Sequence, residues 1–160
     1  MSVSRALAHD VEPLPLLDDL LPYLMNRLVS RLNRNLDAKL RRRRLTFEHW
    51  RVLAVLTAHD RSTVSVLAEL AVIPQATLSR LLARMGERGL VRRSMSRRDS
   101  RLVEVRLTPK GRSLYEEIVP LAVEAYRAAV VGFRPQEIEW LMAAMRRMQD
   151  NVGLGGSGPS

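Results

Sequence analysis

Leucine recurs every fourth residue over a long segment near the start of the chain, and this repeat restricts the fold more than any other feature. The leucines stand at positions 20, 24, 28, 32, 36 and 40, with Leu17 and Leu21 beside them. This spacing predicts one apolar face of a long helix that begins near Leu16. Pro22 lacks an N–H and must either open the helix at its first turn or kink it, and we favour a kink or a restart. The stripe is too long for the core of a small monomer.

A second helix and a short strand are expected after the basic run Arg41–Arg44. Thr46 is placed to cap a helix that ends near His59 and Asp60. A β-like stretch follows at Ser62–Val64. We interpret Arg41–Arg44 as a solvated helix end in preference to a phosphate-contacting patch.

Two helices joined by a tight turn come next. Ser65 is predicted to cap a brief helix through Ala71, and Val72–Pro74 form the connection. Pro74 suits the first turn of a second helix, which runs to about Arg88 and ends at Gly89.

A hairpin and two further helices complete the pattern. The runs Leu90–Ser94 and Leu102–Leu107 are rich in β-forming residues and enclose a charged tip. Thr108 and Pro109 open a helix to about Val131 in which Pro120 should produce a bend, and Gly132 stops it. Pro135 starts a last helix whose apolar face is formed by the following residues: Ile138, Leu141, Met142, Met145 and Met148.

These elements predict a mainly α fold with a small β-hairpin wing, a winged helix-turn-helix flanked by long helices. Residues 46–108 form the winged helix-turn-helix, and residues 16–45 and 109–152 form the flanking helical region. Residues 1–15 are expected to be a flexible arm, and the glycine-rich residues 153–160 a disordered tail.

The charge of the chain makes a polyanion the first partner to consider. There are 26 Lys and Arg against 17 Asp and Glu, a net charge of +9, in a chain of 160 residues with 46% hydrophobic residues. Such a composition is globular, and its basic excess is typical of nucleic-acid binders. Only Lys39 and Lys110 are lysine. Arginine has the planar fork that pairs with phosphate and guanine.

Other classes of chemistry lack the residues they need. The chain has no cysteine, which excludes disulfides and thiolate sites and suits a reducing cytoplasm. The apolar runs fall short of the about 18 residues of a membrane span, and no signal sequence is visible, so we expect neither anchoring nor export. His9, His49 and His59 share no metal-ligand spacing, so no metal, cofactor or catalytic site is expected.

The helix expected over residues 74–88 has a face suited to DNA. Leu78, Leu81, Leu82 and Met85 form its buried stripe at about 100° per residue. Opposite them lie Ala76, Ser79, Arg80 and Ala83. Small side chains permit close approach to base edges, and Arg80 is the best candidate to read guanine.

The hairpin tip carries Arg97, Arg98 and Arg101 around Asp99. Arginine is favoured where a finger enters the narrow and negative minor groove. Asp99 is expected to orient an arginine, because an acid in an arginine cluster stays ionised and paired.

Five segments at the right mutual distances resemble the MarR family of bacterial transcription regulators. They are Leu67-Ala68-Glu69, Thr77-Leu78-Ser79-Arg80-Leu81, Arg88-Gly89-Leu90-Val91, Asp99-Ser100-Arg101 and Leu107-Thr108-Pro109-Lys110-Gly111. The resemblance covers about residues 16–150. Val72 stands where many relatives have glycine, and Pro74 replaces the usual Ser or Asp cap.

The resemblance implies a homodimer that binds an inverted repeat in double-stranded DNA, most simply as a repressor. It implies that Asp99 stabilises the wing, that Arg98, or else Arg97, enters the minor groove, and that the first and last two helices join the dimer. The DNA-binding residues that it implies are Gln75, Thr77, Ser79, Arg80, Arg84, Arg97, Arg98 and Arg101.

The resemblance also raises the question of a small phenolic or aromatic-carboxylate effector that releases the DNA. The candidate residues are Tyr23, Asn26, Arg27, Ser30, His49 and Trp50. The alternatives remain open: Trp50 in the core, His49 on the surface or at a helix cap, and Arg27 in an ion pair across the dimer. A winged-helix module that binds protein or structured RNA without a ligand is the rival function, and a small enzyme for acidic substrates is the third.

Overall fold

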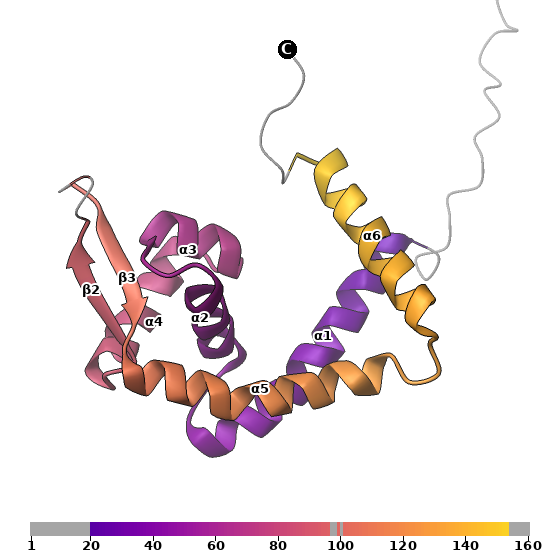
Figure 1. The fold of residues 1–160 in the computed structure, drawn as a ribbon, viewed down its shortest axis with the longest axis horizontal. Helices are drawn as coiled ribbons and strands as arrows, with labels where there is room; N and C mark the ends of the chain where they lie inside the picture. Colours follow the sequence, from indigo (N-terminus) through magenta and orange to yellow (C-terminus); the bar gives the residue numbers. More distant parts are fainter. Residues whose placement is uncertain (1–19, 97–98, 100, 154–160) are drawn as a thin grey trace, which may run out of the picture. The chain divides into compact units, whose positions relative to one another are not determined.

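The computed structural model describes residues 20–96, 99 and 101–153 (Figure 1). The chain divides into two compact units, the first ending at Ile118 and the second beginning at Val119. The helices and the three-stranded sheet confirm the predicted mainly α fold with a small β-hairpin wing. The first unit contains the leucine helix and the start of α5 together with the predicted winged helix-turn-helix.

The leucine helix of the first unit, α1 (Leu21–Leu40), is buried at one end and exposed at the other. Pro22 lies in its first turn, where the missing N–H costs nothing, so the favoured kink is wrong and the proline opens the helix. Leu36 and Leu40 are 4% and 0% exposed, whereas Leu24 and Leu28 are 46% and 52% exposed. The predicted stripe therefore meets the core of the chain along its C-terminal part only.

A short 3-10 turn, η2 (Arg41–Arg43), leads into α2 (Phe47–Ala58), whose start is capped from two sides. Thr46 is the N-cap, as predicted, and His49 Nδ1 accepts the Thr46 N–H at 3.1 Å. The carboxylate of Asp37 on α1 accepts the Phe47 N–H at 3.0 Å. These bonds satisfy backbone donors that a helix start leaves free, and they fix α2 to the end of α1.

Helices α3 (Val64–Ala71) and α4 (Gln75–Glu87) form the predicted helix pair, but Ser65 does not cap the first of them. The cap is Thr63, whose hydroxyl accepts the Val66 N–H at 3.3 Å. Thr63 is held in extended conformation because it belongs to strand β1 (Ser62–Thr63) and pairs with Glu104. The β-like stretch therefore ends one residue earlier than predicted, and the helix starts earlier.

Strands β1, β2 (Val91–Met95) and β3 (Val103–Leu107) form one antiparallel sheet in the order β1-β3-β2. In the β2–β3 hairpin, Val91 pairs with Leu107, Arg93 with Val105 and Met95 with Val103, and Figure 1 shows the two strands side by side. Val91, Val105 and Leu107 are buried at the base of the hairpin, while Met95 and Val103 are exposed farther out. The hairpin therefore projects from a packed base, as a wing does.

The start of α5 (Pro109–Ala129) is locked against the end of α4. The Thr108 hydroxyl accepts the Gly111 N–H at 3.0 Å and donates to the Gly89 carbonyl at 2.6 Å. Gly89 has φ +68°, the left-handed conformation predicted for the residue that ends α4. A Cβ on Gly111 would overlap the Leu90 carbonyl oxygen, so this close approach requires glycine.

The second unit contains the rest of α5, which continues through Pro120, and α6 (Pro135–Asn151). Gly132 has φ +86° in the connection, and Pro135 lies in the first turn of α6, both as predicted. No residue of α6 is buried. Of its predicted apolar face, Ile138, Met145 and Met148 are half-buried, and Leu141 and Met142 are exposed.

Within the part of the chain that the structure describes, no single helix is both long and apolar enough to cross a membrane. Only the bent pair α3 and α4, taken together, reaches that length and composition. The predicted arm at residues 1–15, and all of the predicted tail beyond Gly153, lie outside the described residues.

Candidate nucleic-acid interface

The turn between α3 and α4 sets the direction of the second helix. Val72 adopts a left-handed conformation with φ +51°, and the chain bends by 106° between the two helices. The N–H groups of Val72 and Ile73 donate to carbonyls in the last turn of α3, and Ile73 is 5% exposed. Arg51 of α2 donates to the Val72 carbonyl at 3.3 Å. The turn is thus held by its own backbone, by a buried isoleucine and by a neighbouring arginine.

Helix α4 separates its apolar and polar residues as predicted. Leu78, Leu81, Leu82 and Met85 are 0–3% exposed and anchor the helix in the core. Nine exposed residues form the other faces: Gln75, Ala76, Thr77, Ser79, Arg80, Ala83, Arg84, Gly86 and Glu87. Pro74 is the N-cap and provides no side-chain bond to the first turn. The small and polar outer face is therefore presented by a helix that cannot roll without exposing its leucines.

The wing is bonded directly to this helix through Arg93. Its guanidinium, on β2, donates to the Ser79 carbonyl of α4 at 3.1 Å. Because Ser79 lies on the exposed face, the bond connects the hairpin to the middle of the face proposed to approach DNA. Arg80 donates weakly to the Ala76 carbonyl of its own helix, at 3.4 Å. Its guanidinium can therefore turn outward at little cost.

The turn of the wing is stabilised by Asp99. Its carboxylate accepts the Arg101 N–H at 2.9 Å, and its carbonyl accepts the Leu102 N–H at 3.0 Å. Ser96 closes the strand ends by donating its N–H to the Leu102 carbonyl, and its hydroxyl bonds to the Glu104 carboxylate at 2.6 Å. Arg101 is exposed beside this turn. The predicted tip residues Arg97 and Arg98, and Ser100, lie outside the described residues.

The sequence pattern did not predict the structural hydrogen bonds formed by Arg93, Arg51 and Arg88. All three donate to backbone carbonyls: Arg93 to Ser79, Arg51 to Val72 and Arg88 to Arg44. A long side chain that bonds to a distant carbonyl leaves no periodic signal in the sequence. The alternation of β2 alone places Arg93 on the same face as buried Val91.

The predicted effector residues lie on two helices of the first unit, α1 and α2. Tyr23, Asn26, Arg27 and Ser30 lie on the N-terminal part of α1, where the Arg27 guanidinium lies over the Tyr23 ring at 5.5 Å. Asp37, whose carboxylate bonds to the start of α2, lies seven positions after Ser30, which is about 10 Å along a helix. Trp50 stacks on Tyr115 of α5 with ring centroids 5.3 Å apart. The stacking partner of Trp50 is thus on α5, and the ring under Arg27 is on α1 itself.

His49 has a structural role that weakens the case for it as a ligand residue. It is 7% exposed and its Nδ1 bonds to Thr46. Burial, and then the nearby positive charges of Arg88 and Arg84, lower the pKa of His49 to about 4. The ring is neutral at pH 7 and cannot attract a carboxylate by charge, so the capping alternative describes it.

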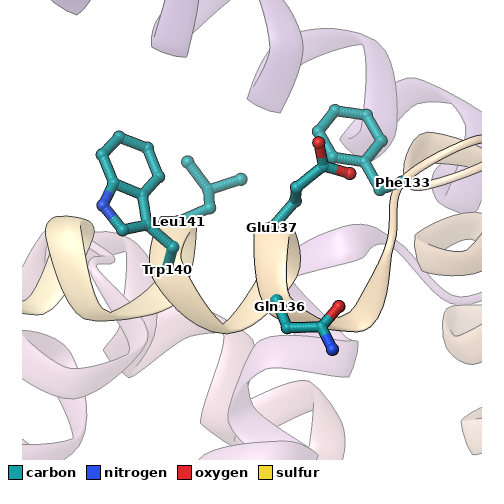
Figure 2. Close-up of a pocket in the computed structure, with 5 residues that line it drawn as sticks. All are labelled: Phe133, Gln136, Glu137, Trp140 and Leu141. Atoms are coloured by element: carbon teal, nitrogen blue, oxygen red, sulfur yellow. The ribbon is translucent and has the colours of Figure 1, made fainter.

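A hollow of about 430 Å³ lies along α6 in the second unit (Figure 2). Phe133, Glu137, Trp140 and Leu141 line it with Gln136. Figure 2 shows the Trp140 ring extending from the helix and the Phe133 ring, on the segment before the helix, near the Glu137 carboxylate. Hydrogen bonds from the Arg134 side chain and backbone lower the pKa of Glu137, so this carboxylate is ionised at pH 7. The Arg134 guanidinium pairs with this carboxylate at 2.9 Å and balances its charge.

Among the described residues, no group of three or more His, Cys, Asp or Glu side chains is placed to hold a metal ion. The arrangement offers instead a small, polar helix face, a wing bonded to it and a surplus of exposed guanidinium groups.

Comparisons with known proteins identify the same arrangement. The sequence model of the MarR family matches residues 45–102. A MarR family transcriptional regulator from Silicibacter pomeroyi has a solved structure that is 34% identical, with 89% of this chain and 96% of that chain covered and a TM-score of 0.81.

Two further relatives have more specific names. The homoprotocatechuate degradative operon repressor of Escherichia coli is 29% identical, with 73% of this chain and 77% of that protein covered. A structure of Bordetella bronchiseptica BpsR is 27% identical, covers 85% of this chain and 97% of that chain, and has a TM-score of 0.75. The DNA binding of BpsR is regulated by 6-hydroxynicotinic acid.

Proposed function

Because the chain belongs to the MarR family of winged helix-turn-helix transcription regulators, we propose that it is a homodimeric repressor that binds an inverted repeat in double-stranded DNA. The observation that carries the proposal is the exposed face of α4, where alanines and short polar residues surround Arg80. A face meant only for solvation has no need of two alanines, whereas close approach to base edges does. Binding to bacterial DNA implies action in the cytoplasm.

The wing extends this interface. Arg93 fixes the hairpin to α4, and Asp99 shapes the turn from which Arg101 projects. We propose that Arg98, or Arg97, enters the minor groove, and that Gln75, Thr77, Ser79, Arg80 and Arg84 face the major groove. The similarity to the homoprotocatechuate operon repressor supports repression of the regulated genes.

The dimer is supported by apolar surface that each unit leaves uncovered. On α1, Leu21, Leu24, Leu28 and Val29 are 46–52% exposed. On the second unit, Trp140 is 71% exposed and the hollow beside it has two aromatic rings. Contiguous exposed apolar surface of this kind marks a protein interface, and a second copy of the chain supplies identical surfaces under twofold symmetry.

We propose that an aromatic carboxylate or phenolic compound releases the DNA. Support comes from the regulation of BpsR by 6-hydroxynicotinic acid and from Tyr23, Asn26, Arg27 and Ser30, which combine a cation, an aromatic ring and short polar groups on α1. Trp50, stacked on Tyr115, is a second aromatic surface and a fluorescent reporter in the same unit. A ligand lowers DNA affinity only if it binds the DNA-incompetent arrangement more tightly.

Selection of duplexes from a random pool by the purified chain tests the DNA-binding proposal. We expect an inverted repeat to emerge, with its half-sites about one helical turn apart. Arg80→Ala should then weaken binding to that site by about 1–3 kcal/mol and affect random DNA much less. Arg112→Ala, which removes one exposed cation from α5, is the matched control. Tight binding of structured RNA or a protein with no duplex preference would favour the rival interaction module.

The effector proposal is tested on the same duplex. Salicylate and hydroxycinnamates are expected to quench Trp50 fluorescence and release the duplex over one concentration range, and Arg27→Ala should abolish both effects while duplex binding persists. Release by the Arg27→Ala variant at unchanged ligand concentration contradicts the proposed carboxylate partner.

A further inference from the structure

We infer that Arg88 is a positioning residue that ties the end of α4 to the ends of the helices flanking the DNA-binding fold. It thereby fixes the separation of the two copies of α4 in the dimer. The inference rests on the proposed function. It assigns a role to Arg88 and to the basic run Arg41–Arg44, neither of which is needed to contact DNA.

Arg88 follows the last residue of α4 and bonds to a distant part of the chain. Its guanidinium donates to the Arg44 carbonyl at 2.9 Å and to the Arg43 carbonyl at 3.4 Å. These carbonyls lie where η2 ends, at a point where the chain turns through the left-handed Arg44, with φ +56°. A planar guanidinium can hold two neighbouring carbonyls in one fixed geometry, whereas an ammonium is a single point charge. The end of α4 is therefore clamped to the end of the leucine helix.

The segment that Arg88 holds is itself fixed on both sides. Arg41 pairs with Asp37 of α1 at 3.0 Å, and the same carboxylate accepts the Phe47 N–H of α2. Arg43 pairs with Glu117 of α5 at 2.6 Å. The side chains of Arg41 and Arg43 are thus used for internal bonds. The segment cannot move without α1, α2 and α5.

The backbone of Arg88 is held from the opposite side. Lys110, in the first turn of α5, donates to the Arg88 carbonyl at 2.8 Å, and the Thr108 hydroxyl bonds to the next carbonyl, that of Gly89. Glycine at position 111 allows α5 to approach this point closely. The end of α4 is therefore bonded through the Arg88 side chain to the end of η2, the turn that follows α1, and through the Arg88 backbone to α5.

This junction has a consequence for DNA binding because α1 and α5 lead to the exposed apolar surface proposed to form the dimer. The buried stripe of α4 resists rolling but does not oppose a tilt about the middle of the helix. The bonds at its end oppose that tilt, so they determine where the partner helices stand relative to each other on the operator. Loss of the Arg88 clamp is expected to loosen the spacing between half-sites and to leave base recognition by each helix intact.

The experiment measures binding of Arg88→Ala to the selected operator and to versions with one or two base pairs inserted at its centre. We expect the wild-type chain to lose at least about tenfold in affinity per insertion, because half-site spacing is a geometric match. For Arg88→Ala the loss should shrink to about threefold or less, and affinity for the uninserted operator should fall by about tenfold. Affinity for a duplex with one half-site scrambled should change less than about twofold.

Two further variants separate geometry from charge and from misfolding. Arg88→Lys keeps the charge but not the fork, and it should lose the spacing preference as Arg88→Ala does. Glu117→Gln breaks the exposed ion pair with Arg43 and should reduce the preference even if Arg88→Ala fails to fold. Arg112→Ala should retain it in full.

A folded Arg88→Lys variant that keeps the wild-type spacing preference overturns the inference. An equal loss of affinity by Arg88→Ala for the intact operator and for the half-scrambled duplex also overturns it, because Arg88 would then be a DNA contact. Failure of the wild-type chain to select any duplex overturns the proposed function instead, and the two failures are therefore distinguishable.

Discussion

Helices α4 and α6 have the same kind of apolar stripe, yet only one stripe is covered by the chain itself. In α4, Leu78, Leu81, Leu82 and Met85 are 0–3% exposed. In α6 no residue is buried, and Leu141 and Met142 of its stripe are 38% and 43% exposed. A helical period identifies which residues share a face, but it does not identify what covers that face.

Helix α1 contains both situations in one element. Leu36 and Leu40 at its C-terminal end are buried, and Leu24 and Leu28 nearer its start are about half exposed. The leucine spacing is identical throughout. The difference therefore comes from the partner surface, which for the exposed residues we propose to be the second subunit.

The comparison predicts that Leu78→Ala in α4 lowers the unfolding free energy of the chain more than Trp140→Ala in α6 does. Leu78 is 0% exposed, and truncation of a buried leucine costs about 2–5 kcal/mol of unfolding free energy through lost burial and a cavity. Urea denaturation at several protein concentrations measures this cost. Ser79→Ala, one residue along on the exposed face, should stay within about 0.5 kcal/mol. Equal costs at the two positions would mean that α4 is not anchored by its leucines.

Trp140→Ala should act on association where Leu78→Ala acts on folding. A tryptophan at the centre of an interface commonly contributes about 2 kcal/mol or more, so we expect the dimer dissociation constant to rise by about 30-fold or more. Analytical ultracentrifugation measures the dissociation constant, and circular dichroism checks that the helices persist.

Glu139→Ala, the exposed neighbour of Trp140, should leave the dissociation constant of the dimer nearly unchanged. Monomeric wild-type protein at all accessible concentrations, or equal effects of Trp140→Ala and Glu139→Ala, would contradict the assignment of the α6 face to a second subunit.

The sequence predicted the elements better than it predicted what holds them together. The predictions for Gly89, Thr46 and Pro135 are confirmed because each residue has a local backbone role that follows from its residue type alone. The Ser65 prediction is wrong because the hydroxyls of Ser65 and Thr63 can both cap a helix, and only the pairing of Thr63 with Glu104 decides between them. That pairing joins residues about forty positions apart and leaves no local signal.

The candidate interface was predictable in part for the same reason. The buried and exposed faces of α4 follow from its period alone. The bonds of Arg93 to Ser79 and of Arg88 to Arg44 depend on tertiary packing, and one exposed arginine resembles another in sequence. The effector residues are grouped by the family resemblance alone, and that grouping stays a prediction.

His49 offers a pH test of how firmly the start of α2 is held against the end of α4. Its pKa is about 4 in the folded chain, against 6.5 ordinarily, because of burial and the charges of Arg88 and Arg84, with Glu48 acting in the opposite direction. As pH falls below 6.5, the unfolded state binds a proton that the folded state refuses. The contribution of His49 to the unfolding free energy is therefore fully present above pH 6.5. It is lost as the pH falls from 6.5 to 4, by up to about 3 kcal/mol.

The loss is measured as the unfolding free energy of the wild type minus that of His49→Gln at each pH. Glutamine can accept the Thr46 N–H in the same capping position but does not titrate. A difference that is constant between pH 6.5 and 4 would show that His49 does not resist protonation.

Val72→Gly is the smallest of these changes and is expected to stabilise the chain. Val72 has φ +51° in the turn before α4, where a β-branched side chain costs about 1–2 kcal/mol and glycine adopts the conformation without strain. Glycine loses more backbone entropy on folding, so the net gain should be below about 1 kcal/mol. Because Val72 is 71% exposed, its removal leaves no cavity. Val66→Gly in α3, where φ is helical, should destabilise by about 1 kcal/mol and serves as the control. A lower melting temperature for Val72→Gly would mean that the valine side chain contributes more at this turn than its strain costs.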